Sequence, residues 1–266
     1  MIKLIATDMD GTLLDGNSKL PENFYDTYNK LYEMGIKFVV ASGRPYLTLR
    51  ENFKPIASKL DFICDNGAYI VESGKEPKIS IIEKAKVNEL IETCKSIPNT
   101  ELLLCGIKGA YRTNIEPKFI KEIDKYYVNQ IVVDDLTKVD DDIFKVTVCD
   151  FNISAENSYK VFYPKFKNEL KVVISGKVWI DITNINVNKG AALSRIKDDF
   201  NISYDETMAF GDFYNDIELL KEAKYSFVME NANDDMKKYG NYIAKKNTEN
   251  GVVQAIEEYI FSNQQI

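Results

Sequence analysis

Histidine is absent from this chain of 266 residues, and its absence narrows the possible chemistry. Hydrolysis by Ser-His-Asp or Cys-His groups, zinc sites built on histidine and phosphohistidine chemistry are all excluded. Any acid–base step must therefore use carboxylates, lysine, tyrosine or cysteine. The carboxylates of the chain are the first candidates for chemistry.

Positive charge and long apolar runs are also scarce. Lys and Arg number 34 against 41 Asp and Glu, which gives a net charge of −7. This balance argues against a nucleic-acid partner, because nucleic-acid binding needs a basic surface, and weakly against an anionic membrane surface. Apolar runs such as residues 36–40 are far too short to span a bilayer. We therefore expect neither nucleic acid nor membrane as a partner.

Signals for secretion and for disulfide bonding are missing as well. Asp8 and Asp10 interrupt the apolar N-terminal stretch and no small-residue cleavage site follows, so the stretch does not resemble a signal peptide. The four cysteines form no Cys-x-x-Cys pair and lie inside apolar segments. These features favour a cytoplasmic protein with buried, reduced thiols.

Apolar strands and helices alternate at the two ends of the chain. Strands are expected over residues 3–7, 36–41 and 61–64, with helices over residues 22–34 and 46–53 between them. This βαβαβ pattern predicts a parallel sheet with right-handed crossovers. After residue 188 the same pattern returns and continues to a final helix over residues 252–261.

The middle of the chain has a different rhythm. After an expected hairpin within residues 68–82, helices and strands follow in an irregular order that includes a helix over residues 117–128. The sequence therefore predicts an α+β module at residues 82–183. This module is inserted into a first domain that comprises residues 1–81 and 184–266.

Two carboxylates follow the first apolar strand directly. Asp8 and Asp10 stand two residues apart and are followed by Gly11 and Thr12. In open α/β sheets ligands bind at the carboxyl ends of the strands, although Asp-x-Asp before glycine also occurs in ordinary loops. Two carboxylates this close repel each other and need a shared proton or a cation. Mg²⁺ is the natural choice, since it prefers oxygen ligands.

A second carboxylate cluster has the same placement. Asp212, Asn215 and Asp216 follow an apolar strand at residues 208–211. Taken alone, Asp212 fits a turn and Asn215 a helix N-cap. If both strands belong to one parallel sheet, however, the two clusters meet at the same edge.

Two further segments carry groups that can bind an anion. Ser42, Gly43 and Arg44 follow the second strand, where a hydroxyl and backbone N–H groups would face an anion; simple turn chemistry explains them equally well. Lys189 opens a helix, a position that the helix dipole disfavours for a cation. Pairing with an anion would explain it, and an exposed lysine is the alternative.

Together these segments resemble the four ordered motifs of the haloacid dehalogenase superfamily. The large insertion and three short segments resemble the Cof-type sugar-phosphatase branch of this superfamily, subfamily IIB. The segments are residues 41–44, 65–68 and 250–252. Asn250 stands where that branch often has an acidic residue. The resemblance covers essentially the whole chain. It implies a Rossmann-like, doubly wound parallel-sheet core with an inserted α+β cap of the C2 type. The motifs are Asp8-Met9-Asp10-Gly11-Thr12, Ser42, Lys189 and Gly211-Asp212-Phe213-Tyr214-Asn215-Asp216.

The resemblance also implies a Mg²⁺-dependent phosphatase that acts on small phosphomonoesters through an aspartyl-phosphate. Asp8 would be the nucleophile and Asp10 the general acid and base, which agrees with the missing histidine. The implied ligands of Mg²⁺ are Asp8, the backbone carbonyl of Asp10 and Asp212. Asn215 and Asp216 would support the ion indirectly, by holding its ligands or through water.

Other residues take implied roles in binding. Ser42 and Lys189 would hold the phosphoryl oxygens, with Lys189 also restraining Asp8, and Thr12 would orient the loop or Asp10. The candidates for further phosphate or substrate contacts are Thr12, Gly43, Arg44, Asn66 and Asn215. The inserted module would close over the site and select the substrate. Its polar candidates are Arg112, Lys145, Ser175, Lys177 and Asp181.

Rival interpretations differ in how well the residues fit them. A cysteine phosphatase needs Cys-x₅-Arg, but Cys105 and Arg112 are one residue too far apart. A nucleotide-binding P-loop needs a lysine where Asn17 stands. A phosphomutase that uses the same aspartyl-phosphate and a non-catalytic sensor of a phosphorylated ligand both stay open. The expected partner is a small phosphorylated metabolite, a sugar phosphate first; the sequence indicates no oligomeric state.

Overall fold

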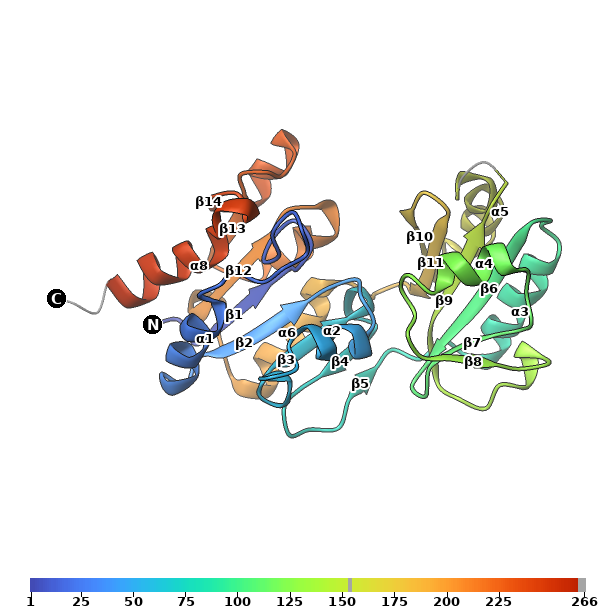
Figure 1. Cartoon of the computed structure of the whole chain (residues 1–266), viewed down its shortest axis with the longest axis horizontal. Helices are drawn as coiled ribbons and strands as arrows, with labels where there is room; N and C mark the ends of the chain where they lie inside the picture. The colour runs from blue at the N-terminus through green and yellow to red at the C-terminus, as the bar shows by residue number, and fades with distance from the viewer. Residues whose placement is uncertain (153–154, 263–266) are drawn as a thin grey trace. The chain divides into compact units, whose positions relative to one another are not determined.

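The computed structural model describes residues 1–152 and 155–262 (Figure 1). Its internal contacts divide the chain into two compact units. The first unit comprises Met1–Gly43, Phe53–Pro77 and the chain from Asn188 onward. The second comprises Arg44–Asn52 and Lys78–Val187. The chain therefore leaves the first unit twice and returns to it twice.

An eight-stranded sheet, of which all but the edge strand at Lys78–Ile79 belong to the first unit, forms the framework of that unit. Its strands are β1 (Leu4–Thr7), β2 (Lys37–Ala41), β3 (Asp61–Cys64), β4 (Tyr69–Val71), β5 (Lys78–Ile79), β12 (Thr207–Gly211), β13 (Tyr225–Met229) and β14 (Tyr242–Ala244). They lie in the order β14-β13-β12-β1-β2-β3-β4-β5. Neighbours from β14 to β3 pair in parallel, and β4 is antiparallel to β3. The predicted parallel sheet is thus present.

Helices cover both faces of this sheet. They are α1 (Phe24–Glu33), α6 (Lys189–Phe200), α7 (Ile217–Lys221) and α8 (Gly251–Ile256), which continues as a π-helix over Glu257–Phe261. The short helix α2 (Tyr46–Asn52) is grouped with the second unit. The helix α1 is shorter than the helix that the sequence predicts over residues 22–34, whereas α8 and its π-helical continuation together span the predicted residues 252–261.

Alternate side chains of the strands enter two separate cores. Val39 and Ile63 belong to a cluster with Leu193 of α6 and Leu219 of α7. On the other face lie aromatic rings: Phe38 of β2 is 5.6 Å from Phe24 of α1, between ring centroids. The period of two along each strand places successive residues on opposite faces. Because both faces are buried, the strands are mostly apolar.

The order of the strands reverses beside β1. From β1 the chain proceeds outward through β2 and β3, and it returns on the other side through β12, β13 and β14. In register, Thr7 lies opposite Phe210, so the strands β1 and β12 end at nearly the same level. Reversal points of this kind leave a crevice at the carboxyl ends of the strands. Asp8 and Asp212 are the first residues beyond these two ends.

The second unit is an α+β module with a mainly antiparallel sheet. Its sheet order is β10-β11-β9-β6-β7-β8, with only the β7–β8 pair parallel. The apolar core on one face includes Leu90 and Phe162 from two of its helices. The smaller cluster on the other face includes Phe119 and Trp179. The elements are α3 (Lys84–Lys95), β6 (Thr100–Gly106), β7 (Ala110–Arg112), α4 (Pro117–Ile123), β8 (Gln130–Val132), β9 (Ile143–Asp150), α5 (Glu156–Phe166), β10 (Leu170–Gly176) and β11 (Trp179–Asn184).

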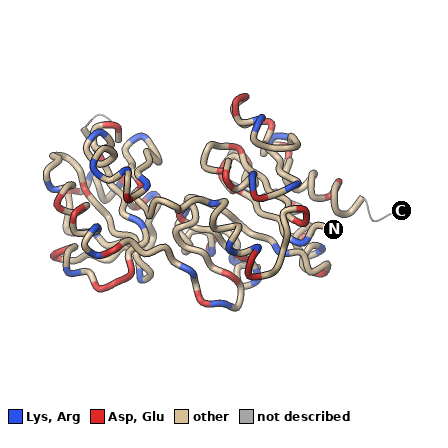
Figure 2. Tube along the Cα trace, turned by 180° about the vertical axis from the view of Figure 1, so that it is seen from behind, with Lys and Arg blue, Asp and Glu red and all other residues tan. Residues whose placement is uncertain are grey.

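Acidic and basic residues are interspersed along both units (Figure 2). Among the described residues, no helix is both long and apolar enough to cross a membrane.

The core of the first unit provides a test of its packing. Phe53 lies outside every helix and strand, yet it is fully buried, with its ring 5.7 Å from Phe24 and 6.1 Å from Phe62. Replacing it with alanine removes this packing and leaves a cavity, so we expect Phe53→Ala to lose about 3–5 kcal/mol of unfolding free energy. Urea denaturation measures the loss. Tyr204→Ala is the control, since Tyr204 is 47% exposed; similar losses in both variants would contradict the packing.

Candidate active site

A buried lysine joins the two carboxylate clusters. Lys189, the first residue of α6, has no exposed surface. Its Nζ lies 2.6 Å from Asp8 Oδ1 and 2.7 Å from Asp216 Oδ1. The structure therefore excludes the exposed-lysine alternative. The cost of a cation at a helix N-terminus, a few tenths of a kcal/mol or more, is offset by two charge-assisted hydrogen bonds.

The surroundings of this cluster shift the pKa of its members. Burial raises the pKa of Asp8 to about 8; Lys189 opposes this effect and Asp216 adds to it. Burial likewise raises the pKa of Asp212 to about 6, again with a contribution from the charge of Asp216. Although burial disfavours its charged form, Asp216 and Asp8 raise the pKa of Lys189 above its ordinary value. The site thus holds more negative charge than one lysine balances.

Asp212 lies directly beside the loop that follows β1. Its Oδ1 accepts a hydrogen bond of 3.1 Å from the hydroxyl of Thr12. Gly11 leaves no room for a side chain beside Asp212, because a Cβ at this position would lie 2.2 Å from Asp212 Oδ2. Gly11 also has φ +84°, a left-handed conformation that glycine adopts most readily. The glycine after Asp10 is therefore needed for the two clusters to meet.

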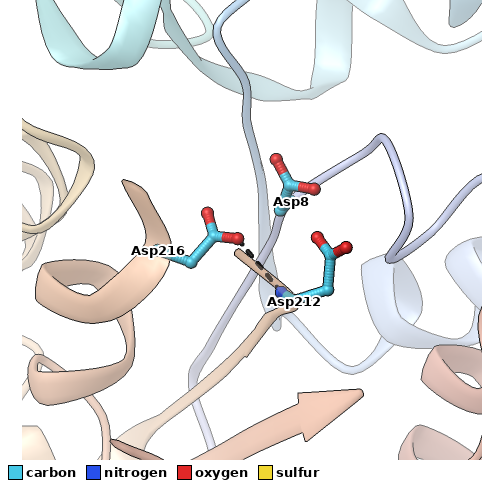
Figure 3. Close-up of side chains that lie close together, drawn as sticks. All are labelled: Asp8, Asp212 and Asp216. Carbon is cyan, nitrogen blue, oxygen red and sulfur yellow. Dashed lines mark hydrogen bonds between the residues drawn. The ribbon is translucent and has the colours of Figure 1, made fainter. Parts of the chain in front are cut away.

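Asp216 has a different hydrogen-bonding pattern from Asp8 and Asp212. Its Oδ1 binds Lys189, and its Oδ2 accepts from the backbone N–H groups of Asp212 and Phe213, both at 3.1 Å. Figure 3 shows its bond to the backbone of Asp212. Both carboxylate oxygens of Asp216 are thus engaged in fixing Lys189 and the turn after β12.

The donor set suits a hard divalent cation. Asp8, Asp212 and Asp216 each offer a carboxylate oxygen, and these oxygens lie within 4.8 Å of one another (Figure 3). Oxygen ligands without histidine or cysteine favour Mg²⁺ over zinc. Because burial raises the pKa of Asp8 and Asp212, a cation there would also stabilise their ionised forms.

Asp10 lies outside this carboxylate cluster and is exposed. Its charge still contributes to the raised pKa of Asp212, so the two residues are within electrostatic reach. Two asparagines that sequence reasoning missed hold the loop containing Asp10. Asn231 donates to the carbonyl of Gly11 at 2.8 Å, and Asn247 donates to that of Leu14 at 2.8 Å.

These asparagines also bind each other, since the backbone N–H of Asn247 donates to Asn231 Oδ1 at 3.0 Å. They are more than 200 residues from the loop, so no local pattern could have indicated the contact. The only signal in the sequence was the density of asparagine around residues 231–250.

The predicted phosphate-binding residues lie on neighbouring strand ends. Ser42 is buried just beyond β2, which pairs with β1. Asn66 follows β3, and its Oδ1 accepts a hydrogen bond of 3.0 Å from Asn215 Nδ2. A Cβ on Gly43 would lie 3.2 Å from Asn66 Nδ2. The structure therefore brings Gly43, Asn66 and Asn215 together.

Arg44 and the polar candidates of the inserted module lie in the second unit. Arg44 donates to Asn52 Oδ1 at 3.3 Å. Arg112 donates to Gln130 Oε1 at 2.7 Å, and Asp181 accepts from the hydroxyl of Thr147 at 2.6 Å. Lys145 is buried, with its Nζ 5.5 Å from the centre of the Tyr127 ring, whereas Ser175 and Lys177 are exposed. Their contact with a substrate stays a prediction.

Comparison with known proteins identifies a family for this chain. The sequence model of the haloacid dehalogenase-like hydrolases matches residues 5–256. A 5-amino-6-(5-phospho-D-ribitylamino)uracil phosphatase of Escherichia coli, YbjI, is 31% identical over 264 residues, covering 97% of this chain and 96% of its own. A Bacillus subtilis phosphatase of the same description, YcsE, is 27% identical with the same coverage of both chains.

Solved structures agree with this assignment. A protein from Eubacterium rectale superposes with a TM-score of 0.90 at 30% identity, covering 97% of this chain and 99% of its own. The subclass IIB sugar phosphatase BT4131 shares the fold, with a TM-score of 0.77 at 21% identity over 97% of this chain and 98% of its own. The chain therefore belongs to the haloacid dehalogenase-like hydrolase family. The predicted fold class and the predicted enzyme class, a phosphoric monoester hydrolase, are confirmed.

The buried ion pairs of Lys189 can be tested by their effect on stability. Lys189→Met removes the ammonium but keeps an apolar stem, so Asp8 and Asp216 are left buried without their cation. We expect a loss of about 3–5 kcal/mol of unfolding free energy in the absence of divalent cations. Urea denaturation at neutral pH in EDTA gives the value.

Lys197→Met, on the same helix, is the matched control. Lys197 pairs with Glu222, whose side chain is 31% exposed, so its removal should cost less because solvent stabilises the remaining carboxylate. An unchanged stability of Lys189→Met, or an equal loss in both variants, would show that the ion pairs do not hold the site together.

Proposed function

We propose that the protein is a Mg²⁺-dependent phosphatase that hydrolyses small phosphomonoesters through an aspartyl-phosphate on Asp8. The observation that supports this most directly is the buried contact of Lys189 with Asp8 and Asp216, placed at the point where the strand order reverses. A carboxylate held at this point by a fixed cation is suited to attack an electrophile bound in the crevice.

The proposed metal site consists of Asp8, the backbone carbonyl of Asp10 and Asp212. Asp216 has both oxygens engaged in hydrogen bonds. Asp216 and Asn215 would therefore support the metal site indirectly, by holding its ligands or through water. When bound, Mg²⁺ would supply positive charge that reduces the repulsion between an anionic nucleophile and an anionic phosphate. The protein supplies the remaining chemistry with its own residues.

Asp8 forms the first new bond. One of its carboxylate oxygens attacks phosphorus, the bond from phosphorus to the ester oxygen breaks, and an aspartyl-phosphate results. The contact between Lys189 Nζ and Asp8 Oδ1 fixes the rotation of the carboxylate. Because Oδ1 is engaged with Lys189, we assign the attack to the other oxygen, Oδ2. Lys189 also offers its charge to the phosphoryl oxygens.

Asp10 moves the protons. As the general acid it protonates the leaving alcohol, and as the general base it then takes a proton from the water that hydrolyses the aspartyl-phosphate. Inorganic phosphate leaves, and Asp8 is restored. The exposure of Asp10 suits this role, because it must exchange protons with both an alcohol and water.

Phosphate binding is assigned to the strand ends around Asp8. Ser42 offers its hydroxyl and Gly43 its backbone N–H, because the backbone N–H of Ser42 already donates to the carbonyl of Ile63 at 2.8 Å. Thr12 orients Asp212 through its hydrogen bond. We assign Arg44 and the second unit to binding the rest of the substrate. The second unit is also assigned the role of a cap. Two relatives are named as 5-amino-6-(5-phospho-D-ribitylamino)uracil phosphatases, and one protein of the same fold is named as a sugar phosphatase. A phosphorylated sugar or sugar alcohol is therefore the substrate class to try first.

The central experiment measures phosphate release from a panel of phosphorylated sugars and sugar alcohols. We expect turnover with Mg²⁺, none with EDTA, and a loss on the order of 10³-fold or more in Asp8→Asn, because the nucleophile is gone. Asp205→Asn, at an exposed surface aspartate, should keep full activity.

Product analysis distinguishes the open alternatives. With a hexose 1-phosphate, free phosphate supports the phosphatase and an isomerised sugar phosphate supports the phosphomutase. Tight binding without turnover on any ester would contradict both and favour a sensor.

The role of Asp10 predicts a different kinetic signature. With p-nitrophenyl phosphate the leaving group needs little protonation, so Asp10→Asn should still form the phosphoenzyme but hydrolyse it slowly. We expect a burst of about one p-nitrophenol per site and a steady state about 10²–10⁴-fold slower than that of the parent protein. Rapid-mixing absorbance measures both phases, with Asp15→Asn as the control in the same loop. Asp10→Asn with normal steady-state turnover would contradict the role of Asp10.

A further inference from the structure

The turn after β3 has an unusual backbone. Asp65, Asn66 and Gly67 follow one another with φ of +49°, +56° and +103°. Left-handed conformations cost a non-glycine residue on the order of 1–3 kcal/mol each and persist where the surroundings fix them. Asn tolerates this conformation better than most residues, but glycine would tolerate it better still. The backbone alone therefore does not explain an asparagine at position 66.

The contacts of Asn66 supply the explanation. Its side-chain Oδ1 accepts the hydrogen bond from Asn215 Nδ2 at 3.0 Å, and its backbone N–H donates to the carbonyl of Ser42 at 3.0 Å. Its amide Nδ2 lies against Gly43. One residue thus links the segment after β2 with the segment after β12, which are more than 170 residues apart in the sequence.

The link continues into the buried ion pairs. Asn215 is followed directly by Asp216, whose carboxylate binds Lys189, and Lys189 binds Asp8. Next to Asn66, Gly67 approaches the helix that carries Lys189 so closely that a Cβ would lie 2.4 Å from the carbonyl oxygen of Asn188. A shift of the turn at residue 66 would therefore displace the groups that orient Asp8.

We propose that Asn66 is a positioning residue, which acts through Asn215 and the Ser42 segment and not through contact with the substrate. The proposal rests on the proposed function. Both partners of the side-chain link are neutral amides, so the link keeps its form at any pH at which the protein folds. Asn66 thus sets the separation between the phosphate-binding segment and the carboxylate segment.

The test uses Asn66→Gly, which keeps the left-handed backbone and removes only the side-chain amide. We expect kcat to fall about 10–100-fold, the range seen when partners of site residues are lost, with KM and inhibition by inorganic phosphate changed less than about threefold. Asn215→Ala breaks the same link from the other side. Because both variants remove one contact, the double variant should be no slower than the slower single variant.

Asn201→Gly is the matched control, because Asn201 is also left-handed, with φ +50°, but ends α6 away from the site residues. It should leave kcat unchanged, and urea denaturation of all variants identifies any that fail to fold. If Asn66→Gly does not fold, Asn66→Ala takes its place in the same comparison. The loss in its double variant with Asn215→Ala then shows whether the two residues act through one contact.

Three results would overturn the proposal. Multiplicative losses in the double variant, weaker inhibition by phosphate in Asn66→Gly, or normal kinetics in Asn66→Gly would each show that Asn66 does not act through Asn215. A parent protein without phosphatase activity would instead overturn the proposed function, so the two failures are distinguishable.

Discussion

The buried ammonium of Lys189 is the interaction on which the rest of the site depends. It binds Asp8 at the end of β1 and Asp216 at the start of α7, and it is itself the first residue of α6. Three segments far apart in the sequence are therefore fixed to one charge. Burial makes each of these charges costly alone, so the arrangement is stable only as a set. With Asp212 added, three carboxylates face one ammonium, and the excess negative charge defines where a divalent cation fits.

The position of this cluster follows from the sheet. The strand order reverses beside β1, and the register of β1 with β12 brings the ends of these two strands to nearly one level. Apolar packing on both faces holds the strands in place, so the loops beyond them can carry charged groups without weakening the core. The amides of Asn231, Asn247 and Asn66 then fix those loops. Rigid strands and amide links together provide the preorganisation that phosphoryl transfer needs.

Local sequence patterns predicted much of this arrangement. Asp8 and Asp212 stood after apolar strands, and Lys189 stood at a disfavoured helix position, so each was visible in its own segment. The links of Asn66, Asn231 and Asn247 were not, because their partners are 149 residues away or more. β8 and β14 were missed since each has only three residues, with no buried alternation. The helix predicted over residues 117–128 stops as α4 at Ile123, after which the chain turns. Arg44, two residues from Ser42, is grouped with the second unit, which sequence proximity could not indicate.

The most direct test of the account is to locate the phosphoryl group during turnover. Borohydride reduces an acyl phosphate to an alcohol, so an aspartyl-phosphate trapped during turnover becomes homoserine. Mass spectrometry of the peptides then identifies the modified position. The account predicts homoserine at position 8, dependent on substrate and Mg²⁺ and absent from Asp8→Asn. Turnover without homoserine, or homoserine at another aspartate, would contradict it.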